Sequence, residues 1–154
     1  MEAATAASAL EVLRGMCRQS EEAPEAFCAE YAATTARAVE LLARSEGDAL
    51  LVGAGGETCL HYAAGCGCLE ACSSLLGRRG ALNFQQDALG QTPLFWAARR
   101  GMVQTAQLLL AHGADPDHAD RQGLTPLRLA RRLGLPRLCR ALRAHGGPDG
   151  GGRG

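Results

Sequence analysis

A repeat of about 33 residues is the feature that most restricts how this 154-residue chain can fold. Threonine recurs at Thr58, Thr92 and Thr125, at intervals of 34 and 33 residues, each time two residues after a glycine. In the first two copies an alanine pair, a second glycine and a leucine pair follow in the same order. Self-similarity at a fixed period of this length is typical of proteins built from stacked structural units.

Each copy contains the features of two short helices. Pro93 and Pro126 directly follow threonine, and this pair opens a helix because proline in the first turn loses no hydrogen bond and threonine can cap free N–H groups. Glycines 67, 101 and 134 can end the first helix with a positive φ. The leucines belong to a second helix. Such a helix pair cannot bury its apolar face alone, so its stability comes from stacking.

The best-preserved copy, from Gly90 to Ala98, reads Gly-Gln-Thr-Pro-Leu-Phe-Trp-Ala-Ala. It resembles the ankyrin-repeat motif Gly-x-Thr-Pro-Leu-His-x-Ala-Ala. The resemblance implies an all-α solenoid of stacked helix pairs with short hairpin loops, and it covers residues 53–146. The three units are expected at about 53–86, 87–119 and 120–146. The copies also depart from the motif: for example, Cys59 replaces proline in the first copy, and Arg128 replaces histidine in the third.

The flanking segments differ from the repeats. Residues 1–52 have helical apolar spacing, with a new helix start near Pro24. We expect a helical N-terminal cap or degenerate repeat there; a partner-binding helix pair is the alternative. Residues 147–154 are rich in glycine and are expected to be disordered.

Composition narrows the class of protein. No apolar run approaches the roughly 18–20 residues that cross a bilayer, and the start lacks the basic and apolar regions of a secretory signal. Seven cysteines, an odd number, fit a reducing compartment better than a disulfide framework. The expected location is therefore intracellular, in the cytoplasm or nucleus, without membrane contact.

One cluster combines residue types that bind metals: Cys59, His61, Cys66, Cys68 and Cys72. A structural zinc site needs four ligands that converge as a tetrahedron. The repeat register instead turns these side chains in different directions, because Cys72 takes an inward position while Cys66 and Cys68 flank a turn. We predict no metal and no cofactor. A thiol-based redox or metal role, with Cys66 or Cys68 as the sensing thiol, is the alternative.

No motif supports catalysis. Histidines 112, 118 and 145 lie at expected loop positions without a partner for nucleophilic chemistry. The stretch from Gly53 to Gly56 lacks the Gly-Lys-Ser/Thr ending of a phosphate loop. We therefore expect a protein that is not an enzyme.

Charge is divided unevenly between the two halves. Residues 1–77 carry 11 acids against 4 arginines, and residues 78–154 carry 12 arginines against 5 acids. Two arginine pairs, Arg99-Arg100 and Arg131-Arg132, fall near the ends of first helices, one repeat apart. We expect these arginines to lie together as a four-arginine block, with the side chain of Trp96 packed beneath them. The other interpretation is that the arginines are solvated helix ends and that Trp96 is packed between repeats.

The resemblance implies that a partner protein binds the concave face formed by the hairpin tips and first helices. On the matching positions, the candidate partner-binding residues are Leu89, Gln91, Trp96, Arg99, Arg100, Arg121, Gln122, Leu124, Arg131 and Arg132. Arginine with tryptophan is the residue mix of interface hot spots.

These features predict a monomeric, non-catalytic interaction module, an adaptor, scaffold or regulatory subunit. Its partner is expected to present an acidic or phosphorylated segment, which arginine can pair with bidentately. Binding of nucleic acid or another polyanion through the arginine-rich half is the alternative; zero net charge and the lack of an aromatic platform beyond Trp96 and Phe95 count against it. The opposite charges of the two halves also allow head-to-tail self-association.

Overall fold

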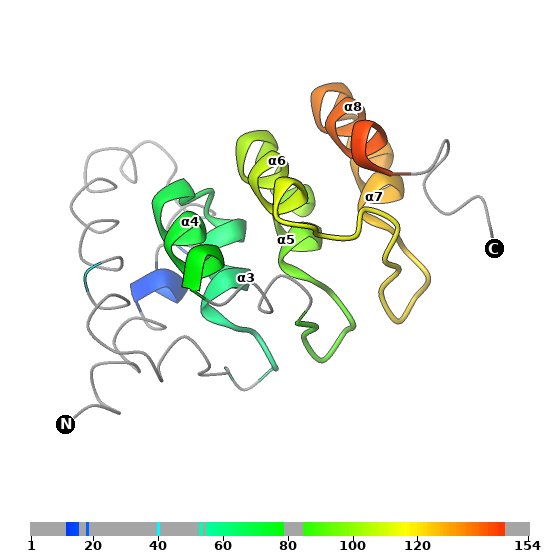
Figure 1. The fold of residues 1–154 in the computed structure, drawn as a ribbon. Coiled ribbons are helices and arrows are strands. Elements are labelled where there is room, and N and C mark those ends of the chain that lie inside the picture. The colour runs from blue at the N-terminus through cyan, green and yellow to red at the C-terminus, as the bar shows by residue number, and fades with distance from the viewer. Residues whose placement is uncertain are drawn as a thin grey trace.

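The computed structural model describes residues 12–15, 18, 40, 53, 55–78 and 85–146. These residues contain no β-strand, and the two long ranges hold six helices, labelled as in Figure 1. The helices are α3 (Cys59–Gly65), α4 (Leu69–Arg78), α5 (Pro93–Arg99), α6 (Val103–Ala111), α7 (Pro126–Arg132) and α8 (Pro136–His145). The all-α prediction is confirmed. The expected cap over 1–52 and the tail over 147–154 lie almost wholly outside the described residues.

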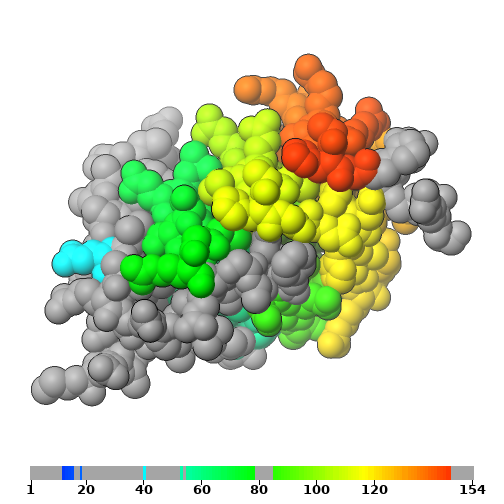
Figure 2. Space-filling model, in the orientation of Figure 1, coloured from blue at the N-terminus to red at the C-terminus, as the bar shows by residue number. Residues whose placement is uncertain are grey.

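The helices form three pairs stacked side by side in two layers. First helices α3, α5 and α7 contact one another in order, and second helices α4, α6 and α8 do the same (Figure 1). The surfaces of the second helices share one face of the molecule (Figure 2). The loops that precede α5 and α7 extend from the layer of first helices as hairpins. This arrangement is the solenoid that the period predicts.

The expected threonine caps form in two of the three repeats. Thr58 and His61 make a capping box at the start of α3, and Thr125 accepts a hydrogen bond from the N–H of Arg128 at the start of α7. The side chain of Thr92 makes no capping bond, and its hydroxyl has no hydrogen-bond partner among the described residues. Pro93, whose ring lacks an N–H, stands in the first turn of α5 and favours the helix without that cap.

The predicted glycine turns are confirmed. Glycines 67, 101 and 134 have φ values of 72°, 68° and 67°, in the left-handed region that favours glycine. Gly67 also lies at a close approach between repeats, because a Cβ there would lie 2.8 Å from the sulfur of Met102. The chain can therefore reverse between the two helices and still pack tightly against the next unit.

Small residues let the first helices approach one another. The alanines of α3 and α5 are fully buried between neighbouring helices: Ala63, Ala64, Ala97 and Ala98. Leucines at matching positions of the three first helices, Leu60, Leu94 and Leu127, are also buried. They belong to one continuous core that includes Leu13, which is buried as well. No helix in the described part of the chain has the length and apolar character that a bilayer crossing demands.

Candidate protein-interaction surface

An aspartate organises each of the last two hairpin tips. Asp87 Oδ1 accepts hydrogen bonds from the N–H groups of Leu89 and Gln91, both at 2.9 Å. Asp120 Oδ1 accepts from Gln122 and Leu124 at the same distance. One carboxylate oxygen thus holds two backbone groups and fixes the turn. Neither aspartate was among the predicted site residues, although the 33 residues between them match the period of the repeat.

The tips are joined into one edge by backbone hydrogen bonds between repeats. The N–H of Ala88 donates to the carbonyl of Gly55 at 2.8 Å, and the N–H of Arg121 donates to the carbonyl of Leu89 at 3.0 Å. Leu89 itself is 58% exposed at this edge. An exposed leucine on a backbone held from both sides is suited to contact a partner.

Trp96 is half-buried beside the hairpin tip that Asp87 organises, and it contacts that tip, helix α3 and the side chain of Arg99. Its Nε1 donates to Asp87 Oδ2 at 3.0 Å. Its ring meets that of Tyr62 edge to face, with centroids 5.3 Å apart, and the guanidinium carbon of Arg99 lies 4.9 Å from the centroid of its ring. Trp96 is therefore packed between repeats, as one interpretation expects, and its ring also contacts an arginine, as the other interpretation expects.

Gln91 differs from its expected exposed position, because its side chain is only 8% exposed. Its Oε1 accepts from Arg99 Nη1 at 3.4 Å, and its Nε2 donates to Asp120 Oδ2 at 3.5 Å. The amide connects the end of α5 to the third tip rather than projecting toward solvent. Its role in the surface is to position Arg99.

The expected four-arginine block is not formed by two equivalent pairs. Arg99 is the last residue of α5 and Arg132 is the last residue of α7, so these two occupy the same place in successive repeats. Arg100 follows α5 at the position that Leu133 takes after α7. Arg131 corresponds to the buried Ala98. The second arginine pair thus lies one residue earlier, relative to the end of its helix, than the first pair does. Only Arg99 and Arg132 therefore occupy equivalent positions in the two repeats.

The remaining candidates lie at the tips and helix ends with varied exposure. Arg121, Gln122, Arg131 and Arg132 are exposed, whereas Arg100 and Leu124 are half-buried. We call Leu89, Trp96, Arg99, Arg121 and Arg132 the tip surface.

The buried side chain of His61 connects the first repeat to the second repeat next to this surface. The N–H of Thr58 donates to Nδ1 of the imidazole at 3.0 Å, so Nε2 carries the proton and donates to the carbonyl of Gln91 at 2.9 Å. Burial lowers the pKa of His61 below its ordinary value, outweighing the opposing effect of the Gln91 carbonyl. A neutral imidazole therefore links the first repeat to the second.

We expect this histidine to make stability depend on pH. The unfolded chain takes up a proton near the ordinary histidine pKa of about 6.5 while the folded chain does not. Stability from His61 is thus complete above that pH and is lost as the pH falls below it, by at most about 1.4 kcal/mol per pH unit. Urea denaturation between pH 7.5 and 5.0 should show a shallower decline for His61→Gln. The exposed control His145→Gln should follow wild type; equal curves for all three would contradict the prediction.

The thiols proposed as redox sensors are enclosed. Cys66 is 4% exposed and Cys68 is fully buried. Burial also raises the pKa of Cys72 well above its ordinary value, which suppresses the reactive thiolate. Within the described residues, no three or more histidine, cysteine or acidic side chains are grouped so that they could hold a metal ion.

Alkylation should therefore be slow in the folded protein. All five cysteines that the structure describes are buried: Cys59, Cys66, Cys68, Cys72 and Cys139. With iodoacetamide at pH 7.5, peptide mass spectrometry should find these five modified at least 100-fold more slowly than in urea. Rapid modification of Cys66 or Cys68 without urea would restore the redox alternative.

Comparison with protein-family models identifies the repeats. A model of three ankyrin repeats matches residues 79–150, and a single-repeat model matches residues 55–88. The chain belongs to the ankyrin-repeat family. Ankyrin repeats indicate protein–protein interaction, and the family matches extend over all six described helices.

Similar curated proteins share only this repeat region. The palmitoyltransferase AKR1 of Lachancea kluyveri is 44% identical over 57 residues. Over the same length, the ARF GTPase-activating protein GIT1 of Homo sapiens is 42% identical and GIT2 of Mus musculus is 40% identical. The match covers 37% of this ankyrin-repeat chain and 8% of each of these relatives.

Proposed function

We propose that this ankyrin-repeat protein is a non-catalytic adaptor, scaffold or regulatory subunit. Its tip surface binds an acidic or phosphorylated segment of a partner protein. The observation that carries the proposal is the set of contacts around Trp96, where Arg99 lies over the ring and Asp87 holds the indole N–H. An arginine positioned in this way loses little side-chain freedom when it binds a carboxylate or phosphate, so more of the interaction energy appears as affinity.

The surroundings of Arg99 fit an anionic ligand with an apolar contact. Leu89 supplies exposed apolar area, and Arg132 supplies a second cation one repeat away. The aspartates of the tips compete little, because Asp87 Oδ1 and Asp120 Oδ1 each already accept two backbone hydrogen bonds. Bidentate pairing by arginine would orient the segment, and the apolar contact would exclude water.

The histidines support a role without catalysis. Each of His61, His112 and His118 has a ring nitrogen in contact with a backbone carbonyl. A general base needs a nitrogen directed at a substrate or nucleophile. Binding, rather than proton transfer, is the function that these contacts favour.

Affinity purification with mass spectrometry tests the proposal. The baits are wild type, Arg99→Glu/Arg132→Glu, and the control Arg128→Glu/Arg143→Glu, which makes the same change in charge at two exposed residues outside the tip surface. Circular dichroism first confirms that all three fold alike. Proteins captured by wild type and the control should fall at least 10-fold with the tip variant. Equal capture by all three baits would contradict the proposal, as would equal loss from both variants.

A further inference from the structure

The third repeat carries a large and unbalanced positive charge. Residues 121–146 contain seven arginines and no acidic residue. All seven arginines are exposed: Arg121, Arg128, Arg131, Arg132, Arg137, Arg140 and Arg143. Like charges at this density repel one another, and an anionic partner would relieve that repulsion. Only part of this charge lies in the tip surface.

The charge on the second helices changes sign along the stack. Counting from each repeat's threonine, Glu70 of α4 corresponds to Gln104 of α6 and to Arg137 of α8. One turn further along the helix, Gln107 of α6 corresponds to Arg140 of α8. These corresponding positions on the second helices are therefore acidic in the first repeat, neutral in the second and basic in the third. The boundary between neutral and basic lies between α6 and α8.

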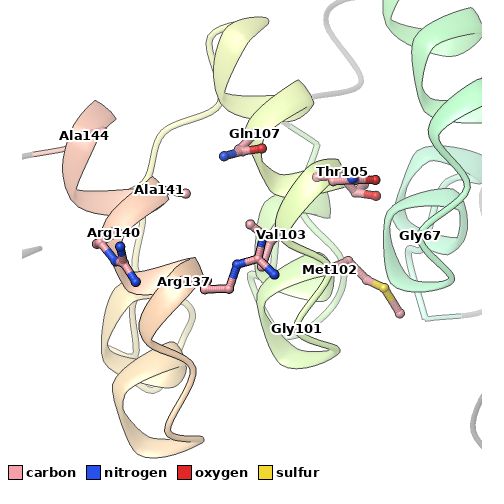
Figure 3. A pocket seen from close by; sticks show the side chains of 11 residues that line it. Gly67, Gly101, Met102, Val103, Thr105, Gln107, Arg137, Arg140, Ala141 and Ala144 are labelled. Atoms are coloured by element: carbon pink, nitrogen blue, oxygen red, sulfur yellow. The ribbon is translucent and has the colours of Figure 1, made fainter.

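A hollow of about 720 Å³ lies at that boundary. It runs from Gly67 past the first turns of α6 to α8, and Gln104, Gln107, Arg137 and Arg140 supply its long polar side chains (Figure 3). Arg137 extends from α8 toward α6 in this view. Among the described residues that line the hollow, none is acidic. Neither of the two arginine side chains has a hydrogen bond or ion pair to another described residue.

We propose that this hollow binds an acidic segment of a protein partner, at a site separate from the tip surface. Two guanidinium groups can pair with carboxylates bidentately, and the two glutamine amides can hydrogen-bond the peptide groups of an extended chain. The first turn of α6 contains no acidic residue, so the positive end of the helix dipole adds to the positive potential there. The volume suits a few residues of peptide.

The observations favour a peptide over a nucleic acid. The described residues that line the hollow include no aromatic side chain, so they offer a base no stacking contact of the kind that single strands use. The net charge of the whole chain is zero, and residues 1–77 carry seven more acids than arginines. A polyanion long enough to continue along the second helices would meet Glu70 of α4, whereas a short acidic segment in the hollow would not.

Fluorescence anisotropy with a fluorescein-labelled peptide of eight glutamates tests the proposal on the full chain. The hollow variant is Arg137→Gln/Arg140→Gln, and the control is Arg128→Gln/Arg143→Gln, which removes the same charge outside both the hollow and the tip surface. We expect the hollow variant to bind the peptide at least 10-fold more weakly than the control does. Because all four substitutions are at exposed positions, thermal unfolding should be unchanged.

Four results would overturn the proposal. Affinities of the two variants within 3-fold of each other would show that the charge acts diffusely, and an absence of wild-type binding would show that the hollow does not take carboxylates. Tighter binding of a labelled 12-nucleotide oligothymidine that is lost in the hollow variant would assign the site to nucleic acid. The variant Arg99→Glu/Arg132→Glu separates the two surfaces, since a loss confined to it would support the tip surface and contradict the hollow.

Discussion

Replacing Leu94 with alanine is expected to lower the free energy of unfolding by about 3 kcal/mol. Leu94 is fully buried in α5, which packs against both α3 and α7. The substitution removes apolar contacts and leaves a cavity that the stacked helices can close only in part. In a repeat stack, the stability is approximately the sum of the stabilities of the units and of the interfaces between them. Damage to the middle unit therefore weakens its interfaces with both neighbouring units.

Leu89→Ala is the matched control, because the same atoms are removed from a side chain that is 58% exposed. It should cost less than about 0.5 kcal/mol. Urea denaturation followed by circular dichroism measures both values. A cost below about 1 kcal/mol for Leu94→Ala, or equal costs for the two variants, would contradict the packing described above.

Replacing Trp96 with alanine is expected to weaken partner binding by about 30-fold, the 2 kcal/mol that defines an interface hot spot. The ring underlies the Arg99 guanidinium, and its N–H holds a carboxylate oxygen of Asp87. Without the ring, Arg99 loses the contact that restrains it and must be ordered when the partner binds. Isothermal titration with the most strongly captured partner measures the change.

Trp96→Phe separates the two contributions of the indole. A phenyl ring keeps an aromatic surface for Arg99 and Tyr62 but cannot donate to Asp87. It should weaken binding by less than about 10-fold, since one hydrogen bond contributes about 1 kcal/mol. If the alanine variant folds by circular dichroism and binds within 3-fold of wild type, Trp96 does not organise the binding surface.

The fold was predictable because its determinants are local and repeated. Threonine and proline at helix starts and glycine at the turns recur in step, and each acts within a few residues of the backbone that it shapes. The missing cap at Thr92 shows the limit of such reasoning. Pro93 already favours the start of α5 there, and whether a hydroxyl also bonds depends on geometry that the motif does not specify.

The candidate surface was predictable only in part. Trp96 and Arg99 do lie together, as the sequence suggested. The burial of Gln91 arises from the distance between one helix end and the next tip, which a linear pattern does not contain. Arg100 and Arg131 do not occupy equivalent positions, because Arg100 follows the end of α5 whereas Arg131 lies one residue before the end of α7. This difference becomes visible only when the helix ends are aligned.

Amide hydrogen–deuterium exchange of this protein, with and without its most strongly captured partner, shows directly whether the tip surface binds that partner. We predict slower exchange in the complex at residues 87–91, 96–101 and 120–124, which include the two tips and the end of α5. The amides of α4 should be unchanged. Protection confined to the second helices, with unchanged exchange at the tips and at the end of α5, would contradict the proposal that the tip surface binds the partner.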